Sequence, residues 1–308
     1  MRQHCFYGSR RAPVERTEMD VGPFRMEVIE PMRRTRVILD DNESGISCDL
    51  TFSARTASIQ EARQTLWQGT RRAMDATRFD QFGRWSGVVN HPDGEIKVDE
   101  SVCLGTKDRS WGVRGIGERE TGGAPIIPEG ICFIWAPLIW DDHISHAIFF
   151  DGQKGEPLAR EGLVAPLYQT EAEIPGVEDG LVERKLTARH RIEYHPGTRL
   201  AKAAEIDLVN LDDGVRRIKL EPKLKFMMKG LGYSHPEWRQ GAWKGELATG
   251  HDSFDPRQLD HEALENIHTQ QLVTATDGER QGVGVLEQIV VGPYEPAGFK
   301  SFFDGYSE

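Results

Sequence analysis

The chain has 308 residues and a formal net charge of −11, with 28% charged and 8% aromatic residues. This length allows a large buried core, either in two domains or in one large all-β unit. The acidic balance argues against nucleic acid or an anionic membrane as a partner, because both attract clustered lysine and arginine. The first twenty residues hold no apolar segment, and no run of about 18 apolar residues follows. We therefore expect a cytoplasmic protein with no nucleic-acid partner and no membrane insertion.

The motifs of common cofactor and metal sites are missing from the sequence. The four cysteines lie far apart and form no CxxC pair, so they fit reduced thiols better than a zinc site or a disulfide framework. There is no phosphate-binding glycine loop, no HExxH, no GxSxG and no dinucleotide-binding fingerprint. We expect neither a metal nor a cofactor.

Short strands between frequent turns dominate the predicted elements. The clearest is Ile46–Ser53, where apolar and polar residues alternate with a period of two, as in a strand with one solvated face. Two segments favour short helices: Gln60–Arg78 has apolar residues at near-helical spacing, and Asp255 with Pro256 is typical of a helix start. The pattern as a whole predicts antiparallel sheets closed into barrels or stacked as sandwiches.

One acidic, turn-rich stretch marks the expected domain boundary. Residues Thr170–Gly180 read TEAEIPGVEDG and hold few large apolar side chains. We place an N-terminal β domain at residues 1–175 and a C-terminal β domain at residues 176–308.

The segment Gly105–Gly117 carries the densest group of functional side chains. In an extended strand Asp108, Ser110 and Arg114 would share one face, whereas Arg109 and Trp111 would share the other. Both faces therefore carry polar chemistry, inside a protein that is otherwise an apolar sheet structure.

Residues Phe133–Phe150 predict a hydrophobic hairpin whose turn holds two aspartates. His146 shares a face with Ile144 and Ile148 and should point into an apolar interior, where a neutral imidazole can exchange a proton or simply be hydrogen-bonded in the core. Trp135 of the same hairpin is a candidate for lining a ligand site. A metal site at the HxxH pair is disfavoured, because strand residues three apart point to opposite faces.

The loop Gly230–Trp243 gathers Tyr233, His235 and Trp238 among glycines and a proline. Such side chains suit a pocket for a lipophilic or aromatic ligand, and they equally suit a loop that closes a barrel end without binding anything.

Glu287 lies in the strand-like run Val283–Val291 on the same face as valines and an isoleucine. Burial would raise the pKa of this carboxyl unless a cation lies close, so Glu287 is either an acid–base group or half of an ion pair. Arg109 and Arg114 are the candidate cations.

These segments together resemble a bacterial family of uncharacterised proteins. The resemblance rests on the DRSWG core with its trailing arginine, the FIWAPL strand, the GLGYSHPEW loop and the GVGVLEQ run, and it covers about residues 21–299. That family is distantly similar to the AttH-like and carotenoid hydratase group, which includes hydroxyneurosporene synthase. The resemblance implies two tandem lipocalin-like β-barrel or sandwich domains with few short helices.

The chain departs from that family in two places. Family members commonly have histidine where Arg109 stands, and an arginine there can hold charge but cannot shuttle a proton. They also usually carry more sequence before the VGPFRMEVIEP segment, which implies an incomplete or opened first barrel.

Two functions fit the sequence. The first is a metal-independent hydratase, lyase or isomerase that acts on a lipophilic or aromatic small molecule held between the two domains. Its catalytic groups would be Asp108, Glu287, His235 and Tyr233, and its substrate-binding groups would be Arg109, Ser110, Trp111, Arg114, Trp135, His146 and Trp238.

The second function is a non-catalytic hydrophobic-ligand binder in which the DRSWG segment clamps the domains. A jelly-roll carbohydrate enzyme with two facing carboxylates is a weaker option. The oligomeric state stays open, with a homodimer as one option.

Overall fold

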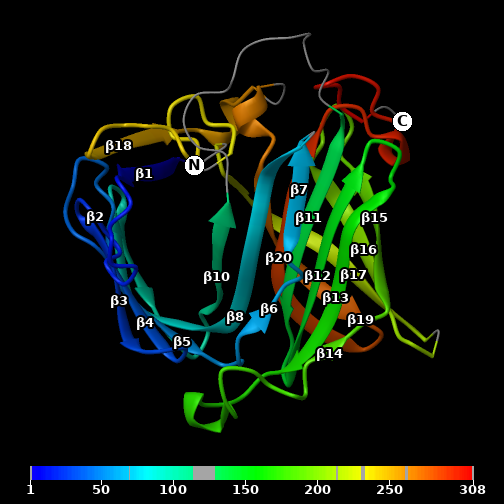
Figure 1. Cartoon of the computed structure of the whole chain (residues 1–308), viewed down its shortest axis with the longest axis horizontal. Helices are drawn as coiled ribbons and strands as arrows, with labels where there is room; N and C mark the ends of the chain where they lie inside the picture. Colours follow the sequence, from blue (N-terminus) through cyan, green and yellow to red (C-terminus); the bar gives the residue numbers. More distant parts are fainter. Residues whose placement is uncertain are drawn as a thin grey trace. The chain divides into compact units, whose positions relative to one another are not determined.

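The computed structural model describes residues 2–68, 70–113, 129–212, 214–229, 233–260 and 263–306. Within them the chain forms 20 β-strands and four short 3-10 helices, and no α-helix (Figure 1). The prediction of an all-β chain on antiparallel sheets with few short helices is confirmed. No helix in the described part of the chain has the length and apolar character needed to cross a membrane.

The chain divides into two compact units, each made of three separate segments. Unit 1 comprises Met1–Gly117, Tyr168–Gly180 and Gly241–Gln258, and unit 2 comprises Glu118–Leu167, Leu181–Gln240 and Leu259–Glu308. This division differs from the two consecutive domains predicted at residues 1–175 and 176–308. Strand pairing explains the difference, because the first strands after residue 130 join a sheet made mostly of C-terminal strands.

Unit 1 holds a nine-stranded antiparallel sheet with the central order β10-β8-β5-β4-β3-β2, and a separate two-stranded ribbon of β1 and β18. The long strand β8 also pairs with three short strands, β6, β7 and β9. The elements of this unit are β1 (Gln3–Arg10), β2 (Asp20–Val21), β3 (Phe24–Glu30), β4 (Arg34–Leu39), β5 (Ser47–Ala54), β6 (Ile59–Gln60), β7 (Gln64–Gln68), β8 (Arg71–His91), β9 (Gly94–Val98), β10 (Leu104–Val113), β18 (Leu247–Phe254), η1 (Glu171–Glu173) and η2 (Pro256–Gln258).

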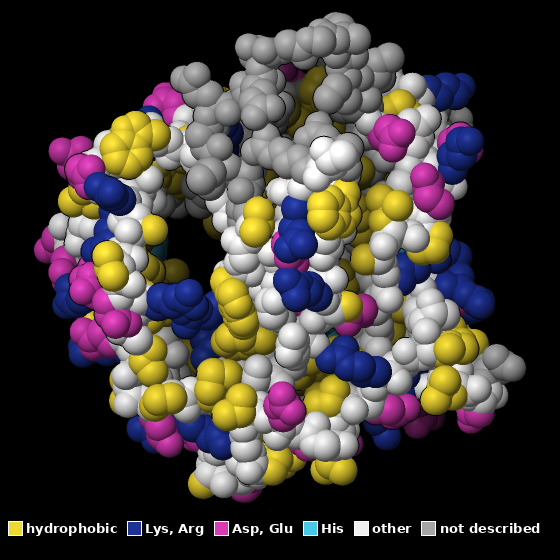
Figure 2. Space-filling model, in the orientation of Figure 1, with side chains coloured by type: hydrophobic (Ala, Val, Ile, Leu, Met, Phe, Trp, Pro, Cys, Tyr) yellow, Lys and Arg dark blue, Asp and Glu magenta, His cyan; other side chains and the backbone are white. Residues whose placement is uncertain are grey.

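The unit 1 sheet curls like a half-barrel, and around β4 and β5 one of its faces carries an ion pair whereas the other carries packed aromatic rings. On the charged face Arg36 binds Asp49 through two hydrogen bonds of 2.7 and 2.6 Å. On the other face Phe52 is fully buried, and its ring lies 5.2 Å from that of Trp85 in an edge-to-face contact. We call the face that carries Phe52 and Trp85 the inner face. The space-filling view shows a hollow between β3 and β4 on one side and β10 on the other (Figure 2).

Local expectations for this unit were partly right. The predicted strand Ile46–Ser53 is β5, and the predicted helix start at Asp255 opens the 3-10 helix Pro256–Gln258. The helical prediction for Gln60–Arg78 is wrong, because these residues form β6, β7 and the start of β8. Pairing with distant strands overrides the local spacing of their apolar residues.

Unit 2 holds one nine-stranded antiparallel sheet with the order β14-β13-β12-β11-β20-β19-β17-β16-β15. Its elements are β11 (Ile131–Ile139), β12 (His143–Gly152), β13 (Pro157–Pro166), β14 (Glu183–Arg184), β15 (Thr187–Tyr194), β16 (Ala201–Val209), β17 (Val215–Met227), β19 (Thr269–Asp277), β20 (Arg280–Val291), η3 (Leu264–Asn266) and η4 (Glu295–Ala297).

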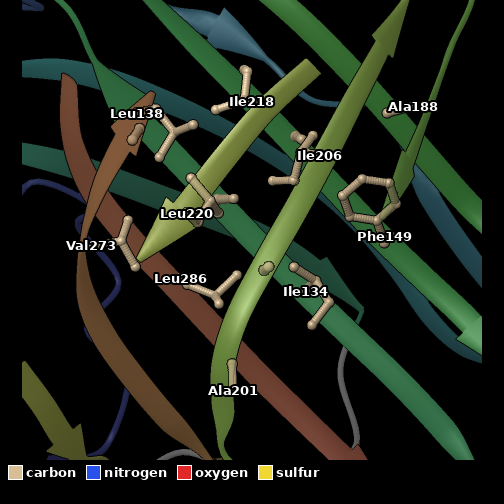
Figure 3. Packing of buried hydrophobic residues seen from close by; sticks show 14 of the residues in the cluster. Ile134, Leu138, Phe149, Ala188, Ala201, Ile206, Ile218, Leu220, Val273 and Leu286 are labelled. Atoms are coloured by element: carbon tan, nitrogen blue, oxygen red, sulfur yellow. The ribbon is translucent and has the colours of Figure 1, made fainter. Parts of the chain in front are cut away.

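The core of unit 2 lies against one face of this sheet. Side chains from β11, β12, β15, β16, β17, β19 and β20 converge there, among them Ile134, Phe149, Ile206 and Leu286 (Figure 3). The predicted hairpin is confirmed as β11 and β12, joined at Trp140–Asp142. Because side chains alternate between faces, residues next to the core positions on β11, β12 and β20 project from the opposite face.

Candidate active site

The DRSWG segment is a strand, as predicted. It lies in β10, which pairs antiparallel with β8 so that Asp108 stands opposite Asp80 and Ser110 stands opposite Arg78. Directly opposed residues of an antiparallel pair point to the same face. Asp108 and Ser110 are solvent-exposed on the charged face of the unit 1 sheet, beside the side chains of Asp80 and Arg78. Arg114 lies outside the described residues.

A buried carboxyl pair adjoins Asp108. Asp80 is fully buried at the centre of β8, and Glu61, which is 3% exposed, follows β6 on the other side of that strand. The backbone N–H of Glu61 donates to the Arg78 carbonyl at 3.0 Å, which fixes Glu61 beside β8. Its side chain accepts a hydrogen bond from the Arg78 guanidinium at 2.9 Å, and it is also hydrogen-bonded to Asp80.

This environment holds a proton on Asp80. Burial raises the pKa of Asp80 well above its ordinary value, and the nearby carboxylates of Glu61 and Asp108 raise it further. Arg78 opposes the rise but does not cancel it, because its hydrogen bond goes to Glu61. The raised pKa favours the protonated form of Asp80, which lies next to the arginine-bound Glu61. The exposed Asp108 lies across the strand pair from a buried proton donor.

The opposite face of β10 carries different chemistry. Lys107, Arg109 and Trp111 point to the inner, apolar side, where the Trp111 ring contacts Phe79 edge-to-face with centroids 6.0 Å apart. The prediction placed Asp108, Arg109 and Trp111 in one site. The structure separates them, because Arg109 and Trp111 share a face that the Asp108 carboxylate does not.

Glu287 is buried, as expected, but its partners are different from those proposed. The carboxylate accepts one hydrogen bond from His268 Nε2 and one from Gln270 Nε2, both at 2.8 Å. An ion pair with Arg109 or Arg114 is one of the two alternatives that the sequence leaves open, whereas these two hydrogen bonds come from a histidine and an amide. Tyr233 contacts the His268 ring edge-to-face at 5.2 Å, so two of the predicted catalytic residues lie around one histidine.

His235 stabilises the fold of its own loop. Its Nδ1 accepts hydrogen bonds from the backbone N–H groups of Glu237 and Trp238, at 3.1 and 3.0 Å. This geometry requires the neutral tautomer with the proton on Nε2. Trp238 is half-buried in the same turn, whereas Tyr233 is 59% exposed.

Trp135 and His146 lie on the sheet face opposite the unit 2 core. Their rings contact edge-to-face with centroids 5.3 Å apart, and both residues are buried. Trp135 stands opposite Glu287 in the pairing of β11 with β20. Unit 2 thus brings Trp135, His146 and Glu287 to one face, and the predicted burial of His146 is confirmed.

Sequence reasoning missed Glu61, Asp80, Lys107 and His268. Asp80 lies in the run RFDQFGRW, where an acid among aromatic residues is a signal of burial similar to the one that identified Glu287. Nothing in the sequence near Glu61 or His268 pairs them with their partners, because β-strand pairing creates both contacts.

The sequence model of a protein family of unknown function, DUF8625, matches residues 1–300 of this chain. The chain belongs to this family. A comparison with curated proteins of known function gave no sequence match.

Two solved structures are similar in fold at low sequence identity. One is a putative AttH from Nitrosomonas europaea, with a TM-score of 0.49 and 12% identity over 84% of this chain and 66% of the other. The other is kievitone hydratase from Nectria haematococca, with a TM-score of 0.46 and 11% identity over 88% of this chain and 69% of the other. The chain thus spans about two thirds of the length of each of these proteins.

Proposed function

We propose that the protein is an enzyme of the hydratase, lyase or isomerase type that acts on a lipophilic small molecule by acid–base catalysis. The observation that carries this proposal is the pairing of the exposed Asp108 with the buried, protonated Asp80. Two adjacent carboxyl groups that share one proton can take up and release protons at neutral pH, which an isolated exposed carboxyl does poorly.

A loss of water illustrates the chemistry. At rest the Asp108–Asp80 pair holds one proton. Asp108 takes the proton from a substrate C–H group, the electrons of that bond form the new C=C bond, and the hydroxyl group leaves from the adjacent carbon. The pair then gives one proton to the leaving hydroxyl, which departs as water, and returns to one proton. Addition of water is the same sequence in reverse.

The neighbouring residues have positioning roles in this scheme. Arg78 binds the Glu61 carboxylate, and Glu61 in turn raises the pKa of Asp80, which favours a proton on Asp80. Ser110 stands next to Asp108 on the same exposed face and is placed to bind a substrate oxygen.

The test combines turnover with a direct titration. Wild-type protein is incubated in D2O with a panel of lipophilic enones and hydroxy ketones, and mass spectrometry records water addition, water loss and deuterium uptake. Asp108→Asn and Asp80→Asn should each reduce turnover by about 100-fold or more, as loss of a general acid or base does. Asp49→Asn is the matched control, because Asp49 lies on the same sheet face in a surface ion pair with Arg36. Unchanged turnover in Asp108→Asn would dismiss the assignment.

A titration tests the same idea without a substrate. The carboxyl carbon of Asp80 is followed by NMR as the pH is raised, with Asp80→Asn used to assign the signal. A transition well above the ordinary aspartate range supports the proposal, and a transition within that range contradicts it.

Binding without chemistry is the second candidate function. The apolar inner face of unit 1 and its hollow favour it (Figure 2). In that case Asp108→Asn and Asp80→Asn would leave ligand affinity unchanged, and the panel would show binding with no chemical change.

A further inference from the structure

The inner face of the unit 1 sheet is lined by apolar side chains that remain partly accessible. Met26 on β3, Val37 on β4, Leu50 on β5 and Trp85 on β8 are all half-buried, and strand pairing places them on this one face. A closed core would bury such residues fully, as it does Phe52. Their partial exposure on one shared face gives an accessible apolar surface of the kind that lines ligand sites.

A lysine points into this apolar surface. The ammonium nitrogen of Lys107 lies 5.5 Å from the ring centroid of Phe52 and 5.9 Å from that of Phe79. Gln81 stands opposite Lys107 on β8, and its amide nitrogen is used by the carbonyls of Met32 and Thr56. The surroundings of the ammonium group are thus aromatic rings and a neutral amide.

Arg109 adds a second cation two residues along the same face of β10. Among the residues that the structure describes, neither Lys107 nor Arg109 forms an ion pair with a carboxylate. Lys107 is half-buried and Arg109 is solvent-exposed, so the two cations lie at the border between the apolar face and water. Burial, and to a lesser extent the charge of Arg109, lower the pKa of Lys107 to about 8. Lys107 thus lies against two aromatic rings with Arg109 on the same face of the strand, and this setting suits an anionic ligand.

We propose that unit 1 binds an amphipathic carboxylate, with its carboxylate group at Lys107 and Arg109 and its apolar body along Met26, Val37, Leu50 and Trp85. The two cations fit the head group, because the guanidinium fork and the ammonium group can each donate to one carboxylate. The apolar lining fits a long-chain or aromatic body. Trp111, which packs on Phe79 beside the cations, covers the head-group end of the site.

This site is separate from the proposed catalytic pair. Lys107 and Asp108 are consecutive residues of a strand and point to opposite faces of the sheet. The binding proposal therefore stands or falls independently of the proposed enzymatic function.

The experiment uses cis-parinaric acid, a fatty acid whose fluorescence rises in apolar surroundings, and its uncharged methyl ester. The wild-type protein should bind the acid at least about 10-fold more tightly than the ester, since a charge-assisted hydrogen bond contributes about 1.5–3 kcal/mol. Lys107→Met should weaken binding of the acid by about 10-fold or more and leave binding of the ester unchanged. Arg109→Gln should act in the same direction.

Two control variants show whether the effect belongs to this face of the sheet. Lys97→Met removes an exposed lysine from β9 of the same sheet and should leave both affinities unchanged. Asp49→Asn should also leave them unchanged, because Asp49 lies on the other face of the sheet in an ion pair with Arg36. The proposal is overturned if the wild type binds neither probe, if acid and ester bind equally, or if Lys107→Met and Lys107→Gln both retain full affinity for the acid.

Discussion

Replacing Lys107 with methionine should stabilise the protein at neutral pH. Methionine has a similar length and no charge, so it keeps the contacts with Phe52 and Phe79 and removes the buried ammonium group. Residues that destabilise the folded protein are typical of functional sites. This variant therefore tests whether Lys107 has a functional role.

The size of the effect follows from the pKa. Burial and the repulsion from Arg109 lower the pKa of Lys107 from its ordinary 10.5 to about 8. At about 1.36 kcal/mol for each pKa unit, the charged lysine costs at most about 3.4 kcal/mol of folding free energy. The side chain keeps some contact with water and gains a weak cation–π attraction, so we expect Lys107→Met to raise the free energy of unfolding by about 1–2 kcal/mol.

The pH dependence has a definite sign. Between about pH 8 and about pH 10.5 the unfolded lysine keeps its proton while the folded lysine has lost it, so the contribution of Lys107 to stability rises with pH in this window. Arg109 is the charged group that faces Lys107, and its other neighbours, Phe52, Phe79 and Gln81, are neutral. The advantage of the methionine variant should therefore be largest at neutral pH and should shrink toward pH 10.5.

Urea denaturation followed by tryptophan fluorescence measures both effects. Lys97→Met serves as the control and should change the unfolding free energy by less than about 0.5 kcal/mol, as surface substitutions usually do. The reasoning fails if Lys107→Met is no more stable than the wild type at neutral pH, or if its advantage does not diminish in alkaline solution.

Three further predictions concern stability. Asp80→Asn should be more stable than the wild type at pH 8 and should lose that advantage toward pH 4, because a carboxyl whose pKa is raised by folding destabilises the folded state as the pH rises. A difference in unfolding free energy between the two proteins that stays constant across this pH range, measured by urea denaturation, would contradict this. Gly83→Ala should lose about 1–3 kcal/mol in urea denaturation, because its new Cβ would lie 2.3 Å from the Ser53 carbonyl oxygen; wild-type stability would disprove the crowding. His268→Ala should lower the unfolding free energy by a similar amount, because it leaves Glu287 buried with one hydrogen bond fewer. His268→Gln should restore part of this free energy, and equal melting temperatures for the two variants would refute the account.

The fold class could be predicted from the sequence because its signals are local. The alternation in Ile46–Ser53 and the turn at Asp141–Asp142 each depend on a few neighbouring residues, and both were found as predicted. The segment Gln60–Arg78 was misassigned because its apolar spacing is ambiguous over a short stretch, and its strands exist only through pairing with other parts of unit 1.

The candidate site was only partly predictable for the same reason. Burial of Glu287 follows from its own strand pattern, but its contact with His268 requires the pairing of β19 with β20. Likewise, Asp108 belongs to a crowded motif that the sequence shows directly, whereas only the register of β10 against β8 places Asp80 opposite it. The sequence pattern indicates which face of a strand a residue occupies, and strand pairing determines which side chains it contacts on that face.

The ribbon of β1 and β18 has a consequence for how the chain is made. Gln3 pairs with Phe254, so the partner of the first strand emerges from the ribosome only after most of the polypeptide has been synthesised. Until then β1 exposes an unpaired edge that can associate with other chains. A fragment that stops at residue 117 or 180 would keep that edge unpaired. Joining Leu247–Phe254 to such a fragment through a linker would cover it.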